Sequence, residues 1–115
     1  MEVSALAKDT GVSARKVRPL VDMIRGKKVE EALTILKFTP TPTARVVAKV
    51  VKSAAANAEN NFQMSPSDLK IVKIFTDEAR TMKRFRAGAR GRVKPILKRS
   101  SHITVIVDEE GSFGT

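Results

Sequence analysis

One segment of the chain, residues 80–107, carries nine Lys or Arg side chains and no Asp or Glu. The whole chain holds 22 basic and 12 acidic residues, so the remainder has 13 basic residues against 12 acidic ones and is nearly neutral. Positive charge concentrated in this way repels itself unless it meets a polyanion. The fold must therefore present this segment to an anionic partner.

The basic segment lies between two runs that are typical of β-strands. Residues 68–77, DLKIVKIFTD, indicate a largely buried strand, and residues 101–108, SHITVIVD, alternate apolar and polar side chains. Between them, Gly88 and Gly91 tolerate the dihedral angles of a turn. The sequence therefore predicts a long β-hairpin arm. Limbs of about 14 residues would extend on the order of 45 Å, at roughly 3.3 Å per residue.

The arm has no core of its own, because charged residues separate its apolar ones, and a two-stranded ribbon alone in water is marginally stable. An anionic nucleic acid would order it, since each Lys or Arg can neutralise a phosphate and arginine also stacks on bases. Phe85, between Arg84 and Arg86, either stacks on a base or packs across the hairpin. The arm residues that we expect to contact RNA are Lys83, Arg84, Arg86, Arg90, Arg92, Lys94, Lys98 and Arg99.

The rest of the chain predicts three helices and a third strand. Apolar residues recur with the helical period in residues 13–26, 29–38 and 42–61, and residues 3–8 indicate a weaker strand. Pro19 lies inside the first helical pattern, so we expect either a kink or a delayed start there. These elements predict an α+β fold.

The length of 115 residues suits one domain with a single modest core. We expect a body of about residues 1–78 and 99–110, and an extended arm of about residues 79–98. The absence of Cys excludes disulfides and thiolate metal sites and suits a reducing compartment. We find no signal peptide pattern and no run of about 18 apolar residues, so we expect no membrane span.

A second group of basic residues lies on and just past the first predicted helix, with Asp22 as the one acid among them. The apolar stripe of the helix places most of these cations on its exposed side. The pattern is either a solvated helix face or a second RNA contact. Beside so basic an arm we favour the RNA contact. The group consists of Arg15, Lys16, Arg18, Arg25, Lys27 and Lys28.

His102 follows Ser100 and Ser101, an order that superficially suggests a catalytic base and nucleophile. Strand residues this close mostly point in different directions, and no third group is evident. The carboxylates at 77–78 and 108–110 form two clusters. Neither cluster has a His or Cys neighbour that could complete a metal site. We therefore expect no catalytic residue, no metal site and no cofactor, and a structural or RNA-contacting role for His102.

Three stretches resemble the bacterial large-subunit ribosomal protein twenty-two family. They are residues 82–107, MKRFRAGARGRVKPILKRSSHITVIV, residues 13–38, SARKVRPLVDMIRGKKVEEALTILKF, and residues 49–61, KVVKSAAANAENN. The resemblance extends in order and spacing over nearly the whole chain. The chain departs from the family at Gly88, where members usually carry Arg, and at Pro19, where they usually carry Leu. It also has Glu-Ala-Arg at 78–80, where members often read Glu-Gly-Pro.

The resemblance implies a body of three helices and a three-stranded antiparallel sheet with one long hairpin. The body would sit near the tunnel opening on the outside of the large subunit, and the hairpin would line the peptide exit tunnel. It further implies binding to 23S ribosomal RNA and a role in early subunit assembly. Expected neighbours are large-subunit protein four and the nascent peptide, with no membrane and no second copy of the chain. The implied location is the cytoplasmic ribosome or the equivalent organelle interior.

The resemblance also implies individual residue roles. It assigns RNA contacts to some residues of each basic group and to His102, and it makes residues 87–92 the tip at the tunnel. Carried over, the RNA contacts are Arg15, Lys16, Arg18, Arg25, Lys83, Arg84, Arg90, Arg92, Lys98, Arg99 and His102. The tip residues are Ala87, Gly88, Ala89, Arg90, Gly91 and Arg92.

An architectural DNA-binding protein is the alternative, since some of these also use β-ribbon arms on a small body. Such arms often kink DNA with an apolar wedge at the tip. The tip in this chain reads Ala-Gly-Ala-Arg-Gly, without Pro, Ile or Leu, which argues against wedging. An enzyme is the remaining reading, and the missing acid–base constellation makes it remote.

Overall fold

The computed structural model describes residues 2–8, 10–79, 82–87 and 93–109. For residues 82–87 and 93–98 it describes the backbone pairing. A short 3-10 turn, Pro66–Asp68, precedes the strand that leads to the arm. The helices and strands, in chain order, are β1 (Val3–Ala7), α1 (Ala14–Ile24), α2 (Val29–Lys37), α3 (Pro42–Phe62), β2 (Leu69–Glu78), β3 (Met82–Ala87), β4 (Val93–Lys98) and β5 (Ser101–Glu109).

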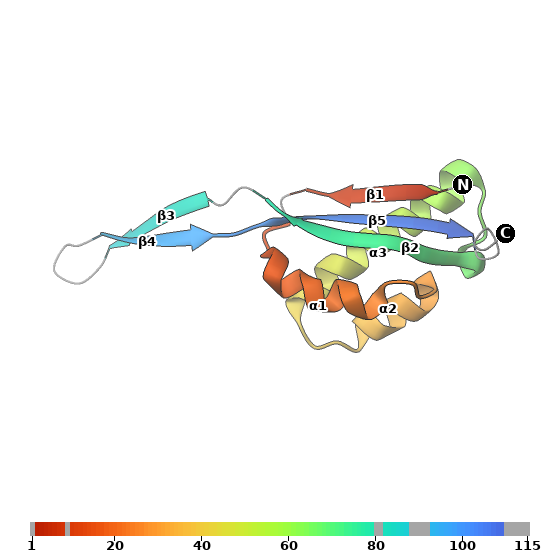
Figure 1. Cartoon of the computed structure of the whole chain (residues 1–115), viewed down its shortest axis with the longest axis horizontal. Helices are drawn as coiled ribbons and strands as arrows, with labels where there is room; N and C mark the ends of the chain where they lie inside the picture. The colour runs from red at the N-terminus through yellow and green to blue at the C-terminus, as the bar shows by residue number, and fades with distance from the viewer. Residues whose placement is uncertain (1, 9, 80–81, 88–92, 110–115) are drawn as a thin grey trace.

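The body is an antiparallel three-stranded sheet in the order β1-β5-β2, with the three helices packed on one face (Figure 1). Ile103, Val105 and Val107 of the central strand are fully buried, while the residues between them are half-buried. This is the alternation that the sequence predicted. The α+β architecture of three helices and a three-stranded sheet is confirmed, and so is the weak first strand.

The prediction that β2 is largely buried is wrong in its second half. The register shifts by one residue along this strand, because Ile71 pairs with Val107 whereas Lys73 pairs with Ile106. A β-bulge of this kind reverses which side chains face the core. Ile74 is therefore buried, and Phe75 is 41% exposed.

Helix α1 runs without interruption through Pro19, so the predicted delayed start is wrong. The helix begins at Ala14, and Pro19 lies exposed inside it. Its missing N–H and ring clash cost about 3 kcal/mol in a helix interior. A stripe of four buried side chains on the opposite side offsets that cost, since burying each such side chain fully contributes roughly 1.5–3 kcal/mol. The stripe consists of Val17, Leu20, Val21 and Ile24.

Helix α3 is the longest of the three helices and packs against β1 and β5. Thr41 caps it by accepting a hydrogen bond from the backbone N–H of Ala44 at 3.3 Å, and Pro42 takes the first turn. The helix ends at Phe62, and the C-cap residue Gln63 adopts the left-handed conformation, with φ of 54°. Its buried face consists mainly of Val and Ala, whose small side chains let the helix lie close to the sheet. The buried residues are Ala44, Val47, Val50, Val51, Ala54 and Ala58.

Strands β3 and β4 pair from Met82 with Lys98 to Ala87 with Val93, so the predicted hairpin ladder is confirmed. A backbone hydrogen bond from Ala79 N–H to the Ser100 carbonyl, at 3.0 Å, joins this ladder to the sheet. The two ladders form one ribbon along the long axis of the molecule, which measures 65 × 25 × 24 Å (Figure 1). The predicted tip and the full limb length fall partly on residues outside the described ranges. No helix in the described part of the chain is long and apolar enough to cross a membrane.

Candidate nucleic-acid interface

A hollow of about 530 Å³ lies where the arm leaves the body, between the start of α1 and the adjoining ends of β2 and β5. It brings together the exposed residues Arg15 and Lys16 with Arg99, which lies more than eighty positions later in the chain. Glu78 is the one acid that lines it. The full lining is Ser13, Ala14, Arg15, Lys16, Glu78, Ala79, Arg99 and Ser100.

The start of α1 is held in this place by Ser101, the first residue of β5, and by Ser100 directly before it. The hydroxyl of Ser101 donates to the Val12 carbonyl at 2.7 Å and lies 2.9 Å from the hydroxyl of Thr10. The Gly11 N–H donates to the hydroxyl of Ser100 at 2.9 Å, and the Thr10 N–H donates to the Ser101 carbonyl at 3.0 Å. These bonds attach the loop before α1 to the start of β5, next to Arg99 in the connection between β4 and β5, and so they build the hollow.

The same contacts settle the apparent pairing of a serine with His102. Ser101 is completely buried, and its hydroxyl is engaged by the loop before α1. His102 is half-buried and lies opposite Asp77 in the sheet register. The serines have a structural role, which the sequence alone did not reveal.

The first turn of α1 lines the hollow and contains no acidic residue. The N-terminus of a helix carries a partial positive charge, which favours anions and disfavours cations. Arg15 and Lys16 add two full positive charges to that end, and Arg99 adds a third across the hollow. Oriented backbone N–H groups together with cations are suited to binding a phosphate.

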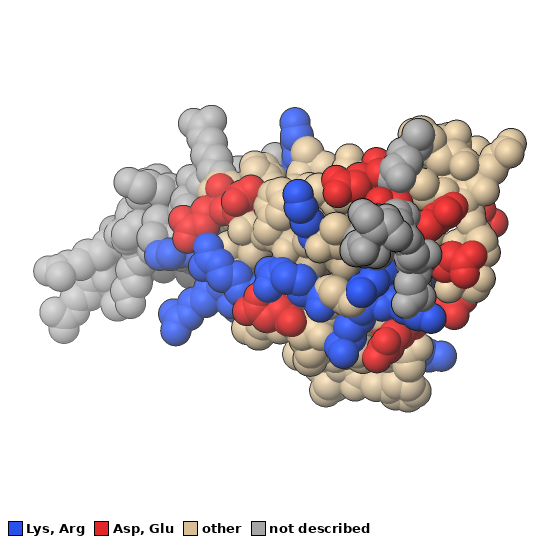
Figure 2. Space-filling view, turned by 45° about the vertical axis from the view of Figure 1, so that its right-hand side comes forward, with Lys and Arg blue, Asp and Glu red and all other residues tan. Residues whose placement is uncertain are grey.

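The basic surface continues from the hollow along α1. Arg18 lies one turn beyond Arg15 and is exposed, as expected from the apolar stripe on the other side of the helix. Figure 2 shows Lys and Arg side chains gathered in a band across this side of the body, starting at the end from which the arm leaves. A band of this kind can follow a nucleic-acid backbone over several phosphates.

Arg25 differs from the other predicted contacts because it is held within the protein. Its guanidinium lies 2.8 Å from a carboxylate oxygen of Asp22 and donates to the Ile74 carbonyl at 3.0 Å. It therefore ties the end of α1 to β2. Lys27, also in the basic group, pairs at 3.8 Å with Glu31. An RNA contact by Arg25 stays a prediction, and its structural role is clear.

For the arm residues the structure describes backbone pairing alone. The register places Arg86 opposite Lys94 and Phe85 opposite Pro95. Like charges directly opposite each other destabilise an antiparallel ladder. Such a pairing suits a ribbon that is used with an anionic partner. The RNA contacts predicted for Lys83, Arg84, Arg86, Lys94 and Lys98 stay predictions. Arg90 and Arg92 lie in residues 88–92, outside the described ranges.

Comparison with known proteins identifies the family. The family model described as Ribosomal protein L22p/L17e matches residues 5–108. A protein of Dehalococcoides mccartyi named Large ribosomal subunit protein uL22 is 71% identical over 107 residues, which covers 93% of this chain and 98% of that relative. A protein of the same name from Pediococcus pentosaceus is 57% identical over 106 residues, 92% of this chain and 90% of the relative. The chain belongs to the ribosomal protein L22p/L17e family.

Family membership confirms the resemblance seen in the sequence. The chain is a structural protein of the large ribosomal subunit and not an enzyme, and its place in the cell is the ribosome. The alternative of an architectural DNA-binding protein has no support in these matches. Within the residues that the structure describes, no group of three or more His, Asp or Glu side chains could hold a metal ion.

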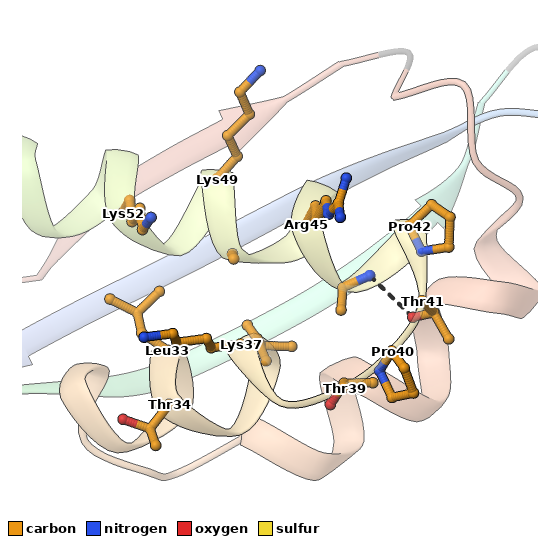
Figure 3. Close-up of a pocket in the computed structure, with 13 residues that line it drawn as sticks. Leu33, Thr34, Lys37, Thr39, Pro40, Thr41, Pro42, Arg45, Lys49 and Lys52 are labelled. Carbon is orange, nitrogen blue, oxygen red and sulfur yellow. Dashed lines mark hydrogen bonds between the residues drawn. The ribbon is translucent and has the colours of Figure 1, made fainter.

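One basic surface was not singled out from the sequence. A second hollow, of about 880 Å³, runs between α2 and α3, and four cations line it (Figure 3). Arg45, Lys49 and Lys52 recur at i, i+4 and i+7 along α3, a spacing that places them on one side of a helix. This spacing was the only sign of the surface in the sequence, and a solvated helix face has the same spacing.

Proposed function

We propose that this protein binds large-subunit (23S) ribosomal RNA through the arm and the adjoining start of α1, acting as one continuous surface. The observation that carries the proposal is the hollow at the arm base. It gathers Arg15, Lys16 and Arg99 from the two ends of the chain, at a helix N-terminus with no acid in its first turn. Membership in a ribosomal family supports RNA as the anion.

The physical basis of the binding is charge neutralisation. Each phosphate that meets a Lys or Arg releases a condensed counterion, so affinity falls steeply as salt rises. The nearly neutral remainder of the chain and the nine cations of residues 80–107 predict that most of this salt dependence comes from the arm. The body cations at the arm base would fix the direction in which the arm leaves the body.

We further propose that the arm lines the peptide exit tunnel while the body stays near the tunnel opening. The elongated shape, 65 Å against 25 and 24 Å, supports a division between a compact body and a reaching arm. Large-subunit protein four and the nascent peptide are the proposed neighbours of residues 87–92. Early subunit assembly is the proposed stage at which the protein binds. These assignments rest on the family resemblance.

Replacing Arg15, Lys16 and Arg99 by Gln tests the arm-base surface. The three side chains are exposed, so the fold should be retained. At about 0.7–0.9 per neutralised phosphate, the slope of log affinity for large-subunit RNA against log salt should flatten by roughly 2 to 3. Titration of the RNA at several salt concentrations measures it.

The matched control is Lys73→Gln, which removes one positive charge from an exposed position on β2. The slope for this variant should stay that of the unmodified protein. Equal changes per charge in the control and in the arm-base variants would refute a defined surface. An unchanged slope in the triple variant would place the RNA contacts elsewhere.

A further inference from the structure

The hollow between α2 and α3 is lined by thirteen residues, four of which are cations and none of which is an acid. The cations are Lys37 of α2 and Arg45, Lys49 and Lys52 of α3, and all four are exposed. This hollow shares no lining residue with the one at the arm base. It is therefore a separate basic surface on the body.

These four cations have no partner among the described residues. No hydrogen bond or ion pair joins their side chains to another group in the part of the chain that the structure describes. By contrast, Arg25 and Lys27 of the first basic group are paired with Asp22 and Glu31. The positive charge along α3 is thus left for an external anion to neutralise.

The spacing of the row on α3 suits an extended polyanion. Arg45 and Lys52, with Lys49 between them, are seven residue steps apart along the helix, a rise of about 10 Å at 1.5 Å per residue. Residues three and four apart are neighbours on a helix surface, and like charges there repel each other. In Figure 3, Arg45 and Lys49 project from α3 away from α2, while Lys37 lies along the α2 side of the hollow. A ligand would therefore need anionic groups at more than one position to contact the cations of both α2 and α3.

An exposed aromatic residue follows one of the cations in the chain, although it does not itself line the hollow. Phe38, which follows Lys37 directly, is 76% exposed, the largest exposed fraction among the large apolar residues described. Exposed aromatic rings beside Lys and Arg are typical of surfaces that stack unpaired bases. The floor between the helices includes Leu33, Leu36 and Ala48, which offers apolar contact to a sugar or a base edge. An acidic peptide would use the cations but has no base to stack on Phe38.

We propose that the α2–α3 hollow binds a second segment of ribosomal RNA, single-stranded at that point, through its phosphates and through stacking of an unpaired base on Phe38. The proposal rests on the RNA-binding function above and adds a surface on the body. The body then contacts RNA on two sides, at the arm base and at α2–α3. The protein would hold two RNA segments together through the body as well as through the arm.

The charge test is the triple variant Arg45→Gln, Lys49→Gln and Lys52→Gln, titrated with large-subunit RNA at several salt concentrations. Gln has a helix propensity close to that of Lys and Arg, so α3 should stay intact. The slope of log affinity against log salt should flatten by about 2, at about 0.7 per single-strand phosphate. Lys73→Gln again serves as the control and should leave the slope unchanged.

The stacking test compares Phe38→Ala with Phe62→Ala, a second exposed phenylalanine at the far end of α3. Loss of one base stack should weaken RNA binding at least roughly five-fold for Phe38→Ala without changing the salt slope. Phe62→Ala should bind as the unmodified protein does. Equal losses in both variants would contradict the role of Phe38.

A single label locates the contact and tests its chemistry. The chain has no Cys, so Thr34→Cys, at an exposed residue that lines the hollow, provides one site for a fluorophore. Titration with poly(U) should change the fluorescence, and polyglutamate of equal length should bind much more weakly. Equal affinity for polyglutamate would overturn the assignment to RNA and favour an acidic protein segment.

The outcomes separate the two proposals. If the unmodified protein binds large-subunit RNA with a steep salt slope, but the α3 triple variant and Phe38→Ala match it, the α2–α3 surface is refuted and the arm-base surface stands. If the α3 triple variant flattens the slope while the arm-base variants do not, the arm-base proposal fails alone. A protein that does not bind the RNA at all refutes both.

Discussion

Removal of the Ser101 hydroxyl should destabilise the body and weaken RNA binding together. Ser101 is completely buried, and its hydroxyl donates to the Val12 carbonyl at 2.7 Å and lies 2.9 Å from the Thr10 hydroxyl. In Ser101→Ala both interactions are lost, and the Val12 carbonyl keeps only the long 3.4 Å contact from Thr10. Of its attachments to residues 100–101, the loop before α1 then keeps only the bond from the Gly11 N–H to the Ser100 hydroxyl and the backbone bond from Thr10 to Ser101.

The magnitude follows from these two interactions. A hydrogen bond contributes about 0.5–1.5 kcal/mol net, and a partner left unsatisfied costs about 1–3 kcal/mol. Thr10 can still bond locally, because its hydroxyl also accepts from the Val12 N–H at 3.3 Å. We therefore expect a loss of about 2 kcal/mol in the free energy of unfolding, or a melting temperature lower by roughly 8 °C for a domain of this size.

Urea denaturation of Ser101→Ala measures this loss, with Ser53→Ala as the matched control. Ser53 is exposed on α3, and its replacement should change the free energy of unfolding by less than about 0.5 kcal/mol. The surviving folded protein should bind large-subunit RNA more weakly at moderate salt, since Arg15 and Lys16 are no longer held opposite Arg99. A loss below about 0.5 kcal/mol, or unchanged RNA affinity, would refute the reasoning that these bonds build the site.

Two further outcomes follow from the fold. Pro19→Ala should raise the free energy of unfolding by about 1–2 kcal/mol, as measured by urea denaturation. The substitution restores a helical N–H, and this gain is partly offset because the unfolded chain becomes more flexible. A decrease would show that the exposed proline ring is needed. Replacing residues 83–97 by Asn-Gly closes the paired residues Met82 and Lys98 with a two-residue turn, and it should leave a folded body, since the described core lies outside the arm. Circular dichroism and thermal unfolding measure this, and a collapse of the cooperative transition would mean that the arm belongs to the core.

Much of the candidate site could be predicted from local sequence. The basic arm, the hairpin ladder and the exposed cations Arg15, Lys16 and Arg18 all follow from charge and period. Arg25 shows the limit of that reasoning, because its bond to the Ile74 carbonyl joins the end of α1 to β2, residues 49 positions apart. The cations on α2 and α3 are a second example. Their sequence pattern is also that of an ordinary solvated helix face, and only the hollow between the two helices distinguishes them.

The sequence by itself determined the elements, because helical and strand periods are properties of neighbouring residues. The stripe of Val17, Leu20, Val21 and Ile24 and the alternation along β5 needed no tertiary information. Only the tertiary structure decided the bulge that turns Ile74 inward and Phe75 outward, since a register depends on the partner strand. It also decided that the arm-base cations meet, because the serine bonds that hold them there join residues about ninety positions apart, and no local pattern records which distant backbone a hydroxyl will find.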